Sequence, residues 1–212
     1  MRLTTLLASL ALASSLLGSS VPAASAAPHV VTSAAKADSM RARVRAKLAE
    51  RRKVTFERFL AYREARVYPV NMENGFQHVW VDNLANLCAA ATLISHDWGR
   101  DAALAVGHEN NQLALASVTE GPLLDWMLTS GMTQAEIVAI QVPGFQQDGA
   151  IRVEEVGRMY GIYVDVERQL RGLDKHNLDL AVDALMKRPA LAKQFLAGQL
   201  ASAGKYGKPP TR

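Results

Sequence analysis

The chain has 212 residues, of which 49% are hydrophobic and 21% are charged, and its formal net charge at pH 7 is +4. This length suits one ordinary domain with an extension, which can bury its own core. The single cysteine excludes an intramolecular disulfide, so that core has to hold the fold without covalent help.

The first 26 residues have the layout of a secretory signal peptide. Arg2 precedes an uncharged, apolar stretch of 16 residues (3–18), and Ala24, Ser25 and Ala26 form a small-residue cleavage site before Ala27. The stretch is shorter than the roughly 20 residues that a spanning helix needs. We therefore expect export to a periplasm or the medium after cleavage near Ala26/Ala27, with no transmembrane segment in the mature chain.

A flexible lead-in (27–35) is followed by a long basic helix (36–66). No glycine or proline interrupts this helix, and the proline at 69 ends it. It carries eleven Lys and Arg against four Asp and Glu, whereas residues 67–212 carry twelve against sixteen. Its apolar stripe is thin as far as Leu48 and wider from Phe56. The front half should be solvated or pair with another helix, and the rear half should dock on the domain.

Residues 77–94 change the period of the apolar pattern. Val79 and Val81 begin an extended run, Asp82 and Asn83 favour a turn, and residues 87–94 are expected to return as a second strand. The alanine-rich return could instead start a helix, and periodicity does not separate the two. We interpret the segment as a small antiparallel β-hairpin.

The remaining signals are helical. Gly121-Pro122 and Pro189 each place a proline in a first helical turn, and Thr133 with Glu136 forms a capping box. The predicted fold is mainly α, with one globular domain over 67–203 and a loose tail over 204–212. Its helices are expected over 97–106, 121–131, 133–141, 151–171, 178–187 and 189–201.

One enzymatic alternative is a hydrolase that uses Cys88 as its nucleophile. A cysteine nucleophile needs a base in reach, which His96 or His108 could supply. The neighbours of Cys88 are leucine and alanines, with no cation nearby in the sequence. A buried, structural thiol is the favoured interpretation.

A second alternative is a metal site. Five possible ligands fall within fourteen residues, and two of their carboxylates are four residues apart. They follow no recognised metal-binding spacing. The candidate ligands are His96, Asp97, Asp101, His108 and Glu109.

Nucleic-acid binding is not expected. Residues 123–140 have the outline of a helix-turn-helix, but there is no Lys or Arg between Gly121 and Gly144 to neutralise phosphates. No phosphate loop, dinucleotide fingerprint or haem-attachment motif is present, so no cofactor is expected.

The basic helix is the feature that most resembles a functional surface. We predict a non-enzymatic binding or structural protein whose basic helix contacts an anionic protein or polymer, or a second copy of the chain. The residues expected to make this contact are Arg41, Arg43, Arg45, Lys47, Arg51, Arg52 and Lys53. Phe56, Phe59 and Leu60 should instead hold the helix to its own domain.

Overall fold

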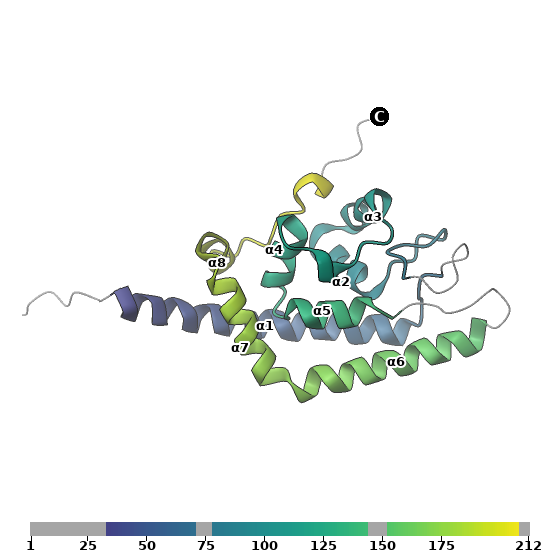
Figure 1. Ribbon diagram of the computed structural model, residues 1–212, viewed down its shortest axis with the longest axis horizontal. Coiled ribbons are helices and arrows are strands. Elements are labelled where there is room, and N and C mark those ends of the chain that lie inside the picture. The colour runs from purple at the N-terminus through teal and green to yellow at the C-terminus, as the bar shows by residue number, and fades with distance from the viewer. Residues whose placement is uncertain (1–32, 71–77, 144–151, 208–212) are drawn as a thin grey trace, which may run out of the picture. The chain divides into compact units, whose positions relative to one another are not determined.

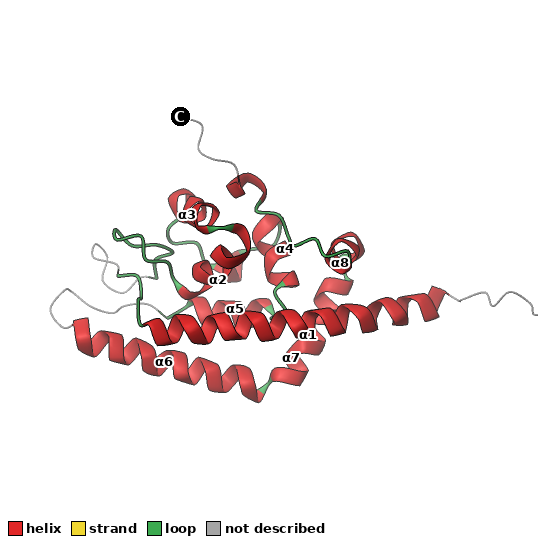
Figure 2. Ribbon diagram, turned by 180° about the vertical axis from the view of Figure 1, so that it is seen from behind, coloured by secondary structure: helices red, strands yellow, loops and turns green. Residues whose placement is uncertain are grey.

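The computed structural model of the protein describes residues 33–70, 78–143 and 152–207. The predicted signal peptide, most of the lead-in and the end of the tail lie outside these residues. The described residues contain eight α-helices, two 3₁₀ helices and no strand, which confirms the mainly α class (Figure 2). The α-helices are α1 (Ser33–Ala65), α2 (Ala89–Trp98), α3 (Arg100–Glu109), α4 (Gly121–Thr129), α5 (Gln134–Gln141), α6 (Arg152–Gly172), α7 (Asp174–Met186) and α8 (Pro189–Leu196).

The basic helix α1 extends through 33 residues without a break. It ends where Arg66 adopts a positive φ of 52° and hydrogen-bonds back to the carbonyl of Arg63. Figure 1 shows α6 running alongside it, with α7 and α8 near its N-terminal half. The helix is thus packed along both halves rather than projecting from the domain.

Two hydrophobic clusters meet α1. The larger one joins the rear half of the helix, through Phe59 and Tyr62, to α2, α4, α5 and α6. The smaller one joins Val44 and Leu48 to α7 and α8, and both of these side chains are fully buried. The thin front stripe therefore pairs with two helices of the same chain, and Phe195 of α8 packs in that cluster.

The predicted β-hairpin near 77–94 is wrong within the described residues, which start again at 78. A single antiparallel bridge joins Val81 to Leu87, and its turn is held by the carboxylate of Asp82, which accepts hydrogen bonds from the amides of Leu84 and Asn86. After Leu87 the chain turns into α2, with the Cys88 thiol as N-cap. Alanine has the highest helix propensity and a low strand propensity, so the alanine run continues as a helix.

The predicted helix-start signals are present in the structure. The capping box at Thr133 is present, and prolines occupy the first turns of α4 and α8. The helix expected over 97–106 is shifted: Gly99, at φ 87°, separates α2 from α3. The final 3₁₀ helix, Gly204–Gly207, lies in the predicted tail.

Candidate functional site

The cations of α1 fall into three groups by what their side chains contact. The first group forms ion pairs on the surface: Arg41 with Asp183 and Arg45 with Asp179, both on α7. The four side chains are about half exposed. Exposed pairs of this kind contribute under about 1 kcal/mol each. These arginines align α1 with α7 and keep part of their charge accessible.

The second group is buried, and Arg52 is its centre. Only 5% of this residue is exposed. Its guanidinium donates to both carboxylate oxygens of Glu136, at 2.6 and 2.9 Å, and to Asp174 at 2.5 Å. Burial opposes ionisation of Glu136, but hydrogen bonds from Arg52, the Thr133 amide and Asn177 outweigh it and lower the pKa of this carboxyl. The guanidinium of Arg52 is therefore held by carboxylates of its own chain.

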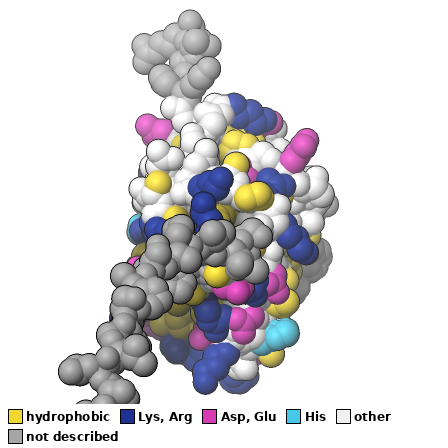
Figure 3. All heavy atoms as spheres, turned by 90° about the vertical axis from the view of Figure 1, so that its left-hand side faces the viewer, with side chains coloured by type: hydrophobic (Ala, Val, Ile, Leu, Met, Phe, Trp, Pro, Cys, Tyr) yellow, Lys and Arg dark blue, Asp and Glu magenta, His cyan; other side chains and the backbone are white. Residues whose placement is uncertain are grey.

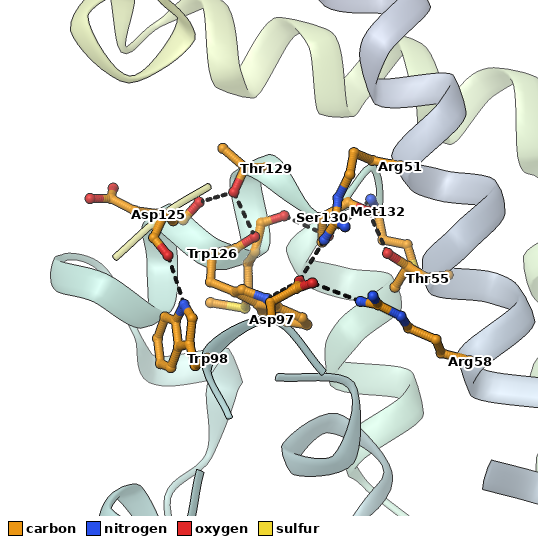
Figure 4. Close-up of polar contacts among 12 residues, drawn as sticks. Arg51, Thr55, Arg58, Asp97, Trp98, Asp125, Trp126, Thr129, Ser130 and Met132 are labelled. Atoms are coloured by element: carbon orange, nitrogen blue, oxygen red, sulfur yellow. Dashed lines mark hydrogen bonds and ion pairs between the residues drawn. The ribbon is translucent and has the colours of Figure 1, made fainter. Parts of the chain in front are cut away.

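Arg51 belongs to the same buried group. Figure 4 shows Asp97 of α2 between Arg51 and Arg58, with Trp126 of α4 beside it. The carboxylate, whose side chain is 2% exposed, accepts from Arg51 at 2.5 Å, from Arg58 at 2.7 Å and from the Trp126 indole at 2.9 Å. Burial alone would raise the pKa of Asp97, but Arg58 and Arg51 lower it overall. One carboxylate thus serves two guanidiniums and leaves an excess positive charge.

The third group has no acidic partner. No carboxylate of the described residues forms an ion pair with Lys36, Arg43 or Lys47 of α1, or with Lys193 of α8. Lys47 instead lies over the Phe195 ring, 5.2 Å from its centroid. Lys53 does not belong to this group, because it is exposed and forms an ion pair at 4.0 Å with Glu57, four residues further along the helix.

Three of these unpaired cations, Lys36, Arg43 and Lys193, line a groove between α1 and α8. The groove has a volume of about 390 Å³ and is lined by Lys36, Ser39, Met40, Arg43, Lys193, Leu196 and Ala197. Its three cations are exposed, whereas Met40 and Leu196 are half-buried, and we refer to these two sets of side chains as the basic rim and the apolar floor. Seen from the side that α1's N-terminal end faces, Lys and Arg side chains lie close to hydrophobic ones (Figure 3). We call this the α1/α8 groove.

Of the seven residues of the basic helix that the sequence led us to expect in the contact, Arg43 lines the groove, and Lys47 lies over Phe195, the chain neighbour of the lining residue Leu196. Arg51 and Arg52 lie inside the fold instead. Lys36 and Lys193 were missed by sequence reasoning. A signal was available for Lys193, because the spacing of Ala192 and Phe195 in α8 buries one face and leaves Lys193 exposed.

The proposed nucleophile and its bases are not brought together. Cys88 is 1% exposed, and burial raises the pKa of its thiol to about 12, which leaves it protonated. His96 lies in the last turn of α2 and His108 in the last turn of α3, both exposed. Among the described residues no hydrogen bond joins either histidine to Cys88. The geometry matches a core thiol that caps a helix.

The five candidate metal ligands are also engaged elsewhere or apart. Asp97 is held by arginines, and Glu109 pairs with Lys205. Within the part of the chain that the structure describes, no group of three His, Cys, Asp or Glu side chains is placed to hold a metal ion.

Comparison with known proteins gives no relative: no family model, no curated protein and no solved structure matches the chain. In the described residues, no helix combines the length and the apolar character needed to cross a membrane.

Proposed function

We propose that the protein is an exported binding protein whose α1/α8 groove holds an acidic, amphipathic segment of a partner protein. The observation that carries this proposal is that three cations without an ion pair in the described chain, Lys36, Arg43 and Lys193, line one groove, with Lys47 over the neighbouring Phe195. The other arginines within α1, at 41, 45, 51, 52, 58 and 63, each have a carboxylate of their own chain.

The apolar floor favours a protein segment over a polyanionic polymer. Met40 and Leu196 offer surface that a sugar or phosphate polymer would not use, whereas a helix with acidic and apolar faces would cover both rim and floor. From Lys36 to Lys47 the helix rises about 16 Å, at 1.5 Å per residue. This length matches three turns of a bound helix. A membrane surface would need a larger apolar face.

The electrostatics predict how such binding should behave. Unpaired surface cations attract an acidic partner over about one Debye length, roughly 8 Å at physiological salt. Association should therefore be fast and sensitive to salt.

The test uses a fluorescein-labelled synthetic helical peptide with glutamates on one face and leucines on the other. Binding to the full chain is followed by fluorescence anisotropy. The variant K36E/R43E/K193E removes the basic rim, and K53E/K175E/K187E makes the same charge change at exposed lysines outside the groove. We expect the rim variant to bind at least about tenfold more weakly and the control to change little.

Two further peptides test whether the groove requires an apolar face in addition to negative charge. A scrambled peptide of equal composition and a polyglutamate should both bind more weakly than the amphipathic one, because neither can cover the apolar floor. Equal binding of all three, or equal losses in both triple variants, would show attraction to net charge only and sink the proposal. Sedimentation of the chain alone tests a second copy as the partner: a dimer that the rim variant abolishes would identify it.

A further inference from the structure

A second pocket lies at the other half of α1, about 22 Å along the helix from Arg43 at 1.5 Å per residue. It has a volume of about 320 Å³, within the range of small-ligand sites. Its walls come from α1 and Val67 just after it, from the turn that precedes α2, from α2 itself, and from Arg100, the first residue of α3. The lining residues are Arg58, Ala61, Tyr62, Ala65, Val67, Asn86, Leu87, Thr92, Ser95, His96 and Arg100.

The pocket has an unbalanced positive charge. Arg58 and Arg100 line it, and no acidic residue does. Arg58 is paired with Asp97, but that single carboxylate also serves Arg51, so the buried cluster keeps one net positive charge. Arg100 adds another, because it is bonded to the carbonyl of Ala85 and not to a carboxylate. An anion entering the pocket would meet two cations and no competing acid in the lining.

The polar groups retain hydrogen-bonding capacity for a ligand. A guanidinium has five N–H donors, of which Arg58 uses one for Asp97 and Arg100 uses one for Ala85. The Ser95 hydroxyl donates to the Thr92 carbonyl and can still accept. Burial and the charge of Arg58 lower the pKa of His96, so its imidazole is neutral at pH 7 and offers one donor and one acceptor.

The lining also has an apolar part, which shares α1 and the turn before α2 with the polar groups. It consists of Ala61 and Ala65 of α1, the buried Tyr62 and Leu87, and Val67, which is 53% exposed. Two alanines one helical turn apart leave room against the helix where larger side chains would fill it. The pocket thus places cationic and polar groups beside an apolar surface.

We propose that this pocket binds a small organic anion, with its carboxylate or phosphate group held by Arg58 and Arg100 and its apolar body against Ala61, Ala65 and Leu87. The site is distinct from the α1/α8 groove and takes a small molecule rather than a protein segment. Its occupant is defined by two features together, an oxyanion and an apolar body. Inorganic phosphate has an oxyanion without an apolar body, and an aromatic amide has an apolar body without an oxyanion.

The test titrates the full chain with benzoate, phenyl phosphate, benzamide and inorganic phosphate, following backbone and arginine Nε signals by NMR. Benzoate, phenyl phosphate or both should bind and shift signals of Arg58, His96 and Arg100. Their relative affinities decide between carboxylate and phosphate. Arg100→Gln should weaken binding about tenfold, because it removes a charged donor. Ala61→Leu should weaken it as much by occupying the apolar wall.

Matched controls are Arg168→Gln, at an exposed arginine of α6, and Ala46→Leu, at an exposed alanine of α1. Both should leave the affinity within about twofold, since neither residue lines the pocket. The proposal would be overturned if benzamide bound as tightly as the aromatic anions, or if neither benzoate nor phenyl phosphate bound. Binding that Arg100→Gln and Ala61→Leu leave unchanged would overturn it as well.

Discussion

Arg52 joins three helices through one guanidinium. It projects from α1 and bonds to Glu136 of α5 and Asp174 of α7, and it also donates to the carbonyl of Gly131 at 3.3 Å. Asn177 donates to the same carboxylate of Glu136 at 2.8 Å. Each charge in this cluster is stabilised by the others, so a change at one member leaves a buried charge without compensation.

We expect Arg52→Met to lower the free energy of unfolding by about 3 kcal/mol, because Glu136 then stays buried without its cation. The double variant R52M/E136Q should recover a large part of that loss, since it leaves no ionised group behind. Urea denaturation of the wild type, both single variants and the double variant measures this coupling. Strictly additive losses would contradict it.

The sequence alone could not show which cations of the basic helix are exposed to a partner and which are buried in the domain. Arg51, Arg52 and Lys53 follow one another as three equivalent charges, and only the packing of α2, α5 and α7 decides which of them faces inward. Arg52 is buried and Lys53 is largely exposed. Arg51 and Arg52 are both held by carboxylates inside the fold and so do not form the expected contact surface with Lys53, while Arg43 and Lys47 remain accessible to a partner.

At the scale of elements, α1 approaches the α4–α5 turn very closely. Gly131 in that turn has φ 86°, and a Cβ atom there would lie 2.2 Å from the amide nitrogen of Arg52 and 2.5 Å from the carbonyl oxygen of Leu48. Thr55 of α1 donates to the Ser130 carbonyl at 2.7 Å in the same region. Only glycine allows this contact between a turn and a helix backbone.

Gly131→Ala should therefore destabilise the fold by at least about 2 kcal/mol, through left-handed strain and a clash with α1. Gly121→Ala is the matched control, because Gly121 has a similar φ of 81° but no atom near its Cβ position. It should cost only about 1 kcal/mol, from the strain alone. Thermal unfolding of the two variants separates the terms. Equal decreases in Tm would mean that the clash between the new Cβ atom and α1 adds nothing to the loss of stability.

The sequence predicted the start of a helix well where a local signal, such as a first-turn proline or a capping box, marks it. Prolines in first turns and the Thr133 capping box need no tertiary contact, and α4, α5 and α8 begin where these signals indicate. The hairpin failed for the opposite reason. The turn at Asp82 is present, but the conformation after Leu87 depended on whether a strand could pair there, and the alanines adopted a helix instead.

At the scale of the whole molecule, α1 is shared by both hydrophobic clusters and by the basic groove. Its buried stripe was visible in the sequence at Val44, Leu48 and Phe59. The groove was not, because it requires α8 to return beside the start of α1, and no periodicity encodes that contact. The fold class was therefore predictable, and the candidate site was predictable only as a charged segment.

Export also concerns the whole chain, and it remains a proposal. Residues 1–26 should be removed, because the Ala24-Ser25-Ala26 segment has small residues at the positions a signal peptidase reads. Intact-mass analysis of protein recovered from the periplasm or the medium should give a chain that starts near Ala27. A dominant mass that retains Met1 to Ala26 would refute the proposal.

The most direct test of the proposed binding of an acidic partner is to map where the acidic amphipathic peptide binds on the intact protein. Amide NMR signals should move at residues 36–47 of α1 and 189–197 of α8, and 0.5 M salt should reverse the shifts. The expected result is a perturbation confined to this groove. Shifts centred on other surfaces would contradict the proposal that the α1/α8 groove binds an acidic segment. Shifts in the groove that persist in 0.5 M salt would contradict it as well.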